Sequence, residues 1–202
     1  METNDKLDYL LRADLYRLLS RGFSYPEKNE LAEISETAKE LLENSLTSDE
    51  IKNHLRLIAG CIREDELLNE YTRLFLKGNV PQTETAVNPS YEALGNLAAF
   101  YKAFGFTPNS GNSPDSLSYE LEFVSLLCLK VALAENHEQR KVTLDALQKF
   151  LSEHVKEFST RFHQRLHDVN AHPFYLYLAH LLESVAGFKE KGKKKSLVKT
   201  IA

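Results

Sequence analysis

Two patterns of residues in this chain have the types and the spacing that could support chemistry. His163 and His167 lie four positions apart, so a helix would carry both imidazoles on one face, as half of a metal site. Glu120 interrupts an apolar run, 117–133, where a carboxylate needs a hydrogen-bonding or cationic partner or else takes a raised pKa. Two interpretations of Glu120 stay open: an internal tie to another helix or loop, or a pocket acid that receives a cationic ligand.

The histidine pair belongs to a very polar stretch, STRFHQRLHDVNAH at 159–172. Because no glutamate completes an HExxH motif, we interpret both residues as solvated surface histidines. A helical metal-dependent enzyme that uses His163 and His167 stays as the alternative hypothesis. The chain also lacks a phosphate-binding loop, a dinucleotide fingerprint and a GxSxG motif, so no catalytic constellation stands out.

The length and composition predict one globular domain. The 202 residues are 43% hydrophobic and 27% charged, enough to bury a full core without metal or disulfide staples. Cys61 and Cys128 fall in apolar helical contexts and belong to no CxxC motif, which predicts free thiols in a reducing compartment. We find no signal peptide and no long apolar span, so we expect a cytoplasmic protein without membrane insertion.

The charge is distributed unevenly along the chain. The net charge is −4, but segment 189–202 holds six lysines and one glutamate, which leaves a body of about −9. An acidic body argues against nucleic acid as the main ligand and is compatible with a basic partner. We interpret 189–202 as a basic, frayed tail, with a DNA-binding regulator that uses this tail as a further hypothesis.

The apolar spacing predicts helices over most of the chain and no alternating strand pattern. The fold class is therefore all-α: a single domain of about eight to ten helices over 1–188, in two lobes before and after a long central loop, 77–89. Such a loop in a compact domain is usually functional or mobile. The expected helices cover 5–20, 27–44, 47–61, 65–76, 90–104, 113–134, 138–153, 155–167 and 173–188.

Residues with capping chemistry suggest where three of these helices begin or end. Gly22 is the expected C-cap of the first helix, and 47–50 (TSDE) has the pattern of a capping box that starts at Thr47. In the central helix, 113–134, we expect Ser113 as N-cap, Pro114 as the first helical residue and Asp115 in the first turn.

Three segments together resemble one family. They are EYTRLFL at 70–76, followed by the loop and PSYE at 89–92; FYKAFGF at 100–106; and PDSLSYELEF at 114–123. In this order they are similar to the TorD/DmsD/NarJ family of redox-enzyme maturation chaperones, and the similarity is densest over 70–123. Two departures are Ser116, where many members have a histidine, and a loop that is poorer in proline than is usual.

The resemblance implies a cytoplasmic, all-helical chaperone that is not an enzyme. Its partner would be the twin-arginine leader peptide, or the apo form, of a molybdenum-cofactor oxidoreductase subunit, which it holds until cofactor insertion and export. We expect no cofactor of its own, no nucleic acid, and either a monomer or a homodimer. The positions that match the family pattern, or replace its histidine, and therefore form the expected peptide-binding set are Tyr71, Leu74, Phe75, Tyr91, Glu92, Pro114, Asp115, Ser116, Glu120 and Glu122.

These residues suggest a groove for the leader. We expect the loop 77–89, the turn 107–112 and the start of the central helix to border it. Aromatic and leucine side chains would take the apolar stretch of the leader. Asp115, Glu120 and Glu92 would meet its arginines, because a carboxylate can accept two hydrogen bonds from one guanidinium.

Overall fold

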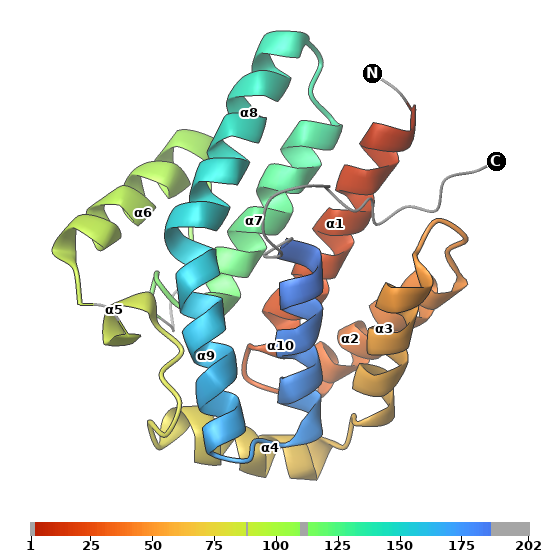
Figure 1. Ribbon diagram of the computed structural model, residues 1–202, viewed down its shortest axis with the longest axis vertical. Helices are drawn as coiled ribbons and strands as arrows, with labels where there is room; N and C mark the ends of the chain where they lie inside the picture. Colours follow the sequence, from red (N-terminus) through yellow and green to blue (C-terminus); the bar gives the residue numbers. More distant parts are fainter. Residues whose placement is uncertain (1–2, 88, 110–112, 187–202) are drawn as a thin grey trace.

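A computed structural model of the chain describes residues 3–87, 89–109 and 113–186, and it is helical almost throughout, with no strand among these residues (Figure 1). The predicted all-α fold class is therefore confirmed. No helix in the described ranges is long and apolar enough to cross a membrane. The helices, with two π-helical segments marked η, are α1 (Thr3–Gly22), α2 (Lys28–Glu43), α3 (Asp49–Gly60), α4 (Glu64–Tyr71), η1 (Thr72–Leu76), α5 (Glu84–Val87), α6 (Tyr91–Phe104), α7 (Leu117–Ala132), α8 (His137–Phe150), η2 (Leu151–Val155), α9 (Lys156–Asp168) and α10 (Pro173–Ala186).

Helix α7 lies at the centre of the fold, between α1 and α8 (Figure 1). The apolar stripe expected from its sequence is buried throughout: Leu117, Leu121, Val124, Cys128 and Val131. Burying a side chain of this size stabilises the fold by about 1.5–3 kcal/mol relative to leaving it in water. The stripe therefore explains why this helix, rather than a more polar one, occupies the middle.

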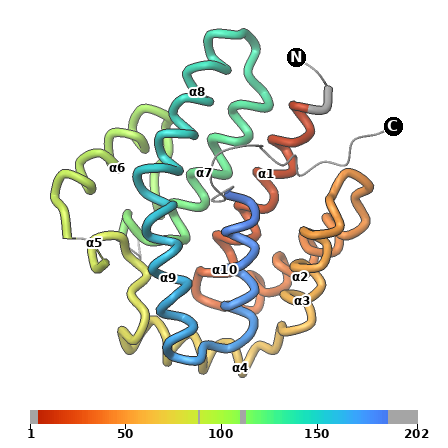
Figure 2. Tube along the Cα trace, viewed as in Figure 1, coloured from red at the N-terminus to blue at the C-terminus, as the bar shows by residue number. Residues whose placement is uncertain are grey.

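Contacts cross between the parts of the chain that precede and follow the loop 77–89. α1 packs along α7, and α10 packs on α3 and on α1, so the segments before and after the loop form one body (Figure 2). The division into two lobes stays a prediction. The predicted basic tail, 189–202, lies outside the described residues. Both cysteines are free; Cys128 is buried and Cys61 is half-buried.

The expected start of the central helix was wrong. α7 begins at Leu117, and its N-cap is Ser116 rather than Ser113. The preceding residues form a turn closed by a 3.0 Å hydrogen bond from Ser116 N to Ser113 O. The reason is that Asp115 turns away from its own helix and binds the backbone of α5, as described below.

Two further caps differ from the expectation. Gly22 is the last residue of α1 and has no left-handed backbone; a Cβ there would lie 2.6 Å from Leu178 Cδ1, so glycine lets α10 approach α1 closely. At the start of α3 the N-cap is Ser48, whose side chain accepts a hydrogen bond from Ile51 N at 3.4 Å. Thr47 is instead buried.

The two π-helical segments each lie within a continuous helical run. η1 extends α4, and η2 joins α8 to α9 where the sequence analysis expected two separate helices. The i→i+5 hydrogen bonding of a π-helical turn accommodates an inserted residue and shifts the side chains around the helix axis, and such segments are frequent at functional sites. η2 places His154 in the interior, where only 2% of its surface is exposed.

Candidate functional site

The loop 77–89 is docked against the rest of the fold by a chain of hydrogen bonds. The side chain of Gln82 accepts a hydrogen bond from the Tyr71 hydroxyl at 3.1 Å and donates one to Phe23 O at 2.9 Å. The backbone carbonyl of Gln82 accepts a hydrogen bond from Leu117 N at 2.9 Å. Glu84 N donates to Asp115 O at 3.0 Å. The segment is thus ordered onto the start of α7, and it contains the short helix α5.

Asp115 is the residue that holds α5 in place. Its carboxylate is fully buried and accepts hydrogen bonds from Thr85 N at 2.9 Å, from Thr85 Oγ1 at 2.5 Å and from the Ser113 hydroxyl. Burial by itself raises the pKa of Asp115, but the hydrogen bonds from Ser113 and Thr85 outweigh it, so the pKa lies below its ordinary value. Asp115 therefore serves the fold, and its oxygens are not open to an external ligand in this conformation.

Glu120 is also fully buried, in α7 one turn after Ser116. Neither of its carboxyl oxygens has a hydrogen-bond partner among the described residues, so within these residues Glu120 makes no tie to another helix or loop. Burial raises the pKa of Glu120 well above 4.5, and the nearby Glu84 and Asp115 raise it further. The fold therefore favours the protonated, uncharged carboxyl.

We expect Glu120→Met to raise the free energy of unfolding by about 1–3 kcal/mol near neutral pH, because Met is similar in length and leaves no polar atom unpaired. The folded-state pKa is raised, so the stability that the carboxyl contributes is complete below about pH 4.5 and is lost as pH rises toward that pKa. The gain should therefore grow with pH. Urea denaturation over a pH series measures it, with the exposed Glu138→Met as control; a gain that is independent of pH would contradict the assignment.

The three matching residues of the first motif, Tyr71, Leu74 and Phe75, belong to one cluster of packed, mostly aromatic side chains. Leu74 and Tyr71 are buried, and the Tyr71 and Phe75 rings meet edge to face with centroids 4.9 Å apart. The Phe75 ring also packs against Tyr175 of α10, with the ring centroids 5.2 Å apart, and against Phe162 of α9, with the centroids 6.0 Å apart. Through Phe75, this cluster packs η1 against α9 and α10.

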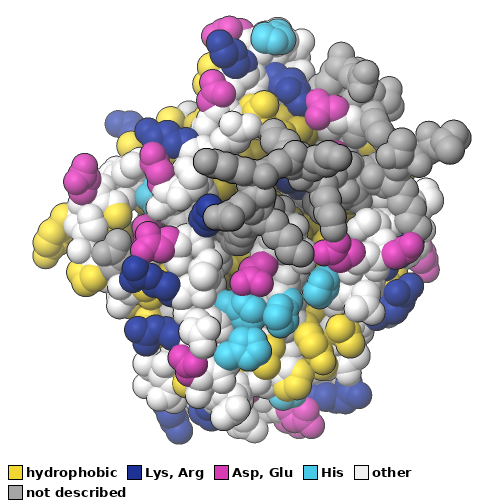
Figure 3. All heavy atoms as spheres, viewed as in Figure 1, with side chains coloured by type: hydrophobic (Ala, Val, Ile, Leu, Met, Phe, Trp, Pro, Cys, Tyr) yellow, Lys and Arg dark blue, Asp and Glu magenta, His cyan; other side chains and the backbone are white. Residues whose placement is uncertain are grey.

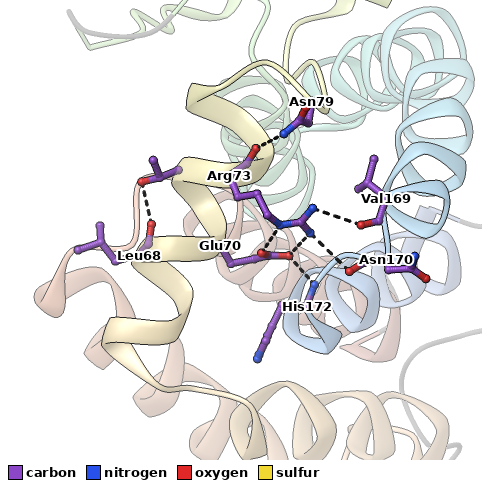
Figure 4. Close-up of polar contacts among 8 residues, drawn as sticks. Leu68, Glu70, Arg73, Asn79, Val169, Asn170 and His172 are labelled. Atoms are coloured by element: carbon purple, nitrogen blue, oxygen red, sulfur yellow. Dashed lines mark hydrogen bonds and ion pairs between the residues drawn. The ribbon is translucent and has the colours of Figure 1, made fainter.

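The same motif holds the turn between α9 and α10 through a polar network (Figure 4). Glu70 accepts hydrogen bonds from Arg73 Nε and Nη2 and from His172 N, each at 2.7 Å. Arg73 in turn donates to the carbonyl oxygens of Val169 at 3.3 Å and Asn170 at 3.4 Å. Burial by itself raises the pKa of Glu70, but the bonds from Arg73 and His172 lower it below its ordinary value. The sequence analysis missed this role, although the i,i+3 spacing of a Glu and an Arg was a signal for the pair.

The other expected site residues are dispersed. Tyr91 is 96% exposed, and Glu92 and Pro114 are exposed as well. Ser116 is buried, and its hydroxyl lies 3.2 Å from the Ser118 hydroxyl, so the place where many relatives have a histidine holds a small polar contact here. Glu122 is half-buried. Of the acids in the expected set, Glu92 is the one whose surface position suits an external ligand.

A small hollow of about 30 Å³ opens between α5, η2 and α9. His154 Nδ1 lies 2.8 Å from Glu84 Oε2 at its inner side, and Glu153 accepts a hydrogen bond from Asn96 of α6 at 3.1 Å. Glu92 precedes Asn96 by one helical turn and so lies on the same face of α6. The hollow combines acids with two apolar side chains; its lining is Glu84, Val87, Glu153, His154, Glu157, Phe158 and Arg161.

The two histidines singled out from the sequence are in different environments. His167 is exposed, as expected, but His163 is half-buried and its Nδ1 lies 2.8 Å from Glu183 Oε1. His180 of α10, which the sequence analysis did not consider, has its ring centroid 4.5 Å from that of His163. Burial and then the neighbouring His163 lower the pKa of His180, while Glu183 opposes the shift.

Comparison with known proteins agrees with the fold and the motifs. The chain matches the family described as nitrate reductase delta subunit over residues 28–164, which is more than half of its length. A crystal structure from Archaeoglobus fulgidus, described as a redox enzyme maturation protein, superposes with a TM-score of 0.57 at 21% identity, covering 89% of this chain and 94% of that one. No curated protein matches the chain in sequence.

The family match identifies the chain as a redox-enzyme maturation chaperone, a class of protein that assists other proteins and does not catalyse a reaction. Within that class, this chain belongs to the nitrate reductase delta subunit family. The resemblance inferred from the sequence is therefore confirmed, and the hypothesis of a metal-dependent enzyme is set aside.

Proposed function

We propose that this chain is a cytoplasmic chaperone for a molybdenum-cofactor oxidoreductase subunit. It binds the twin-arginine leader peptide of that subunit, its apo form, or both, before cofactor insertion and export. The observation that carries the proposal is the family match over residues 28–164. The acidic surface is compatible with a basic ligand, because the body of the chain is about nine charges negative without its tail.

We place the arginine-binding surface at the hollow between α5, η2 and α9, extended by Glu92 of α6. Glu153 and Glu157 are exposed at its rim, and the half-buried Val87 offers apolar surface beside them, while Phe158 lines the hollow from the interior. Glu157 already binds the Arg161 guanidinium at 2.5 Å one turn along α9, which supports an arginine site at this rim; a leader arginine would exchange with it. Asp115, which we expected at the groove, supports it from the interior by holding α5, and Glu120 is buried in the first turn of α7.

Calorimetric titration of synthetic leader peptides tests the proposal. We expect a cognate twin-arginine leader to bind with about micromolar affinity, or about −8 kcal/mol, because a flexible peptide must be ordered on binding. A leader with both arginines changed to Gln should bind more weakly. Added salt should weaken the cognate complex, since the acids lie at the surface.

Two variants locate the site. Glu92→Gln and Glu153→Gln should each weaken binding by about tenfold, close to the 1.4 kcal/mol expected of one charge-assisted contact. Asp145→Asn, an exposed acid on α8 that does not line the hollow, is the matched control and should leave affinity unchanged. A cognate leader that binds no better than a scrambled peptide would refute the leader model. Capture of the apoenzyme alone would keep the chaperone role and move its site elsewhere.

A further inference from the structure

Three histidines converge where α9 packs against α10. His163 and His167 share one face of α9, and His180 faces them from α10. One ring nitrogen from each can be chosen so that all three lie within 4.8 Å of one another. Figure 3 shows histidine side chains gathered on the face of the molecule where these two helices lie.

We propose that His163, His167 and His180 bind one divalent transition-metal ion, with Zn²⁺ as the representative ion. Imidazole nitrogens are its common ligands, at about 2.0–2.1 Å in a tetrahedral arrangement. In that geometry the nitrogens lie about 3.4 Å apart, so the most distant pair must approach by about 1.4 Å, which small side-chain rotations can supply. Mg²⁺ and Ca²⁺ do not suit the site because they prefer oxygen ligands.

The contacts of His163 point to a ligand independently of the clustering. Its Nδ1 lies 2.8 Å from Glu183 Oε1, an arrangement in which the carboxylate fixes the ring and accepts the Nδ1 proton. Its Nε2 is then the nitrogen left to bind an ion. That atom is buried and has no hydrogen-bond partner within the described part of the chain. A bound cation would satisfy it.

The fourth position of a tetrahedral ion is open to water or to a side chain of another protein, since the rim of the cluster at His167 is exposed. The ion would tie the C-terminal half of α9 to the middle of α10, on the side of the helix pair nearer the turn at 169–172 that the Glu70–Arg73 network holds. The ion would stabilise the packing of α9 against α10. Its site is separate from the peptide-binding surface proposed above.

Metal binding by the purified, tag-free chain tests the proposal. After treatment with a chelator, the chain should take up one Zn²⁺ in a calorimetric titration, and its melting temperature should rise with free zinc by mass action. Co²⁺ should bind in place of zinc and give the visible absorption bands of a tetrahedral site. Magnesium should change neither reading.

Variants assign the ligands. His180→Gln and His167→Gln should each lower zinc affinity by about tenfold or more, and Glu183→Gln, which removes only the orienting carboxylate, should lower it within about 10–100-fold. His137→Gln, at the exposed start of α8, is the control and should bind as the parent does. His167 is exposed, so its variant keeps the test valid if a buried variant unfolds. Absence of one-to-one binding, or binding that survives loss of His167 and His180, would overturn the proposal.

Discussion

Phe123→Ala is expected to lower the free energy of unfolding by about 3–5 kcal/mol, the usual cost of emptying a buried phenylalanine site. Phe123 is fully buried in α7. Its ring centroid lies 4.8 Å from that of Phe150, 4.9 Å from that of Tyr101 and 5.5 Å from that of Phe106. These rings attach α6 to α7 and α8. The cavity would therefore weaken both the core and the attachment of the helix that carries Glu92.

Urea denaturation followed by circular dichroism measures the loss, and amide hydrogen exchange shows whether α6 is released first. Phe123→Leu keeps part of the volume and should cost less. The exposed Leu133→Ala, just after α7, is the matched control and should stay within about 0.5 kcal/mol of the parent. A loss below about 1 kcal/mol for Phe123→Ala would mean that this ring cluster is not part of the cooperative core.

Asp115→Ala is expected to cost about 2–4 kcal/mol near neutral pH, because it leaves the Thr85 N–H and two hydroxyls without their charged acceptor. The folded-state pKa of Asp115 is depressed, so its contribution is present above its ordinary pKa of 3.8 and is lost as pH falls through the folded value. The difference between parent and variant should therefore shrink in acid. This dependence on pH is opposite in sign to that of Glu120.

Chemical denaturation at several pH values measures this difference directly. Asp115→Asn keeps one oxygen acceptor and should cost less than Asp115→Ala, whereas the exposed Asp145→Asn should cost almost nothing. Because Asp115 holds α5, the alanine variant should also weaken leader binding at the hollow that α5 borders. Full stability of Asp115→Ala at neutral pH would show that α5 is held by other contacts.

Local pattern was enough to predict the longer helices, although it missed α5 and the continuous run from α8 to α9, and the reason for this success is geometric. A buried helix must repeat apolar residues every three or four positions, so the stripe from Leu117 to Val131 marks α7 without knowledge of its neighbours. The residue types at 70–76, 100–106 and 114–123 were likewise enough to indicate the family. These are properties of consecutive residues, which the sequence alone displays.

The roles of individual polar residues depended on contacts between distant segments. Asp115 has the chemistry of a helix N-terminal residue, but three hydrogen bonds involving Thr85 and Ser113 outweigh that local preference and move the start of α7. Glu120 was recognisable as a carboxylate on an apolar helix. Whether a cation met it depended on tertiary packing, which brings Glu84 and Asp115 near it.

Tertiary structure alone brought His180 to the histidine pair and His172 N to Glu70. His167 and His180 are separated by a turn and two helical turns of α10, and Glu70 and His172 by about half the chain. Sequence periodicity describes which face of a helix is apolar, but not which helix covers that face or at what height two helices pack. The sequence by itself thus determined the fold class and the family, whereas helix packing decided which charged and metal-binding side chains meet.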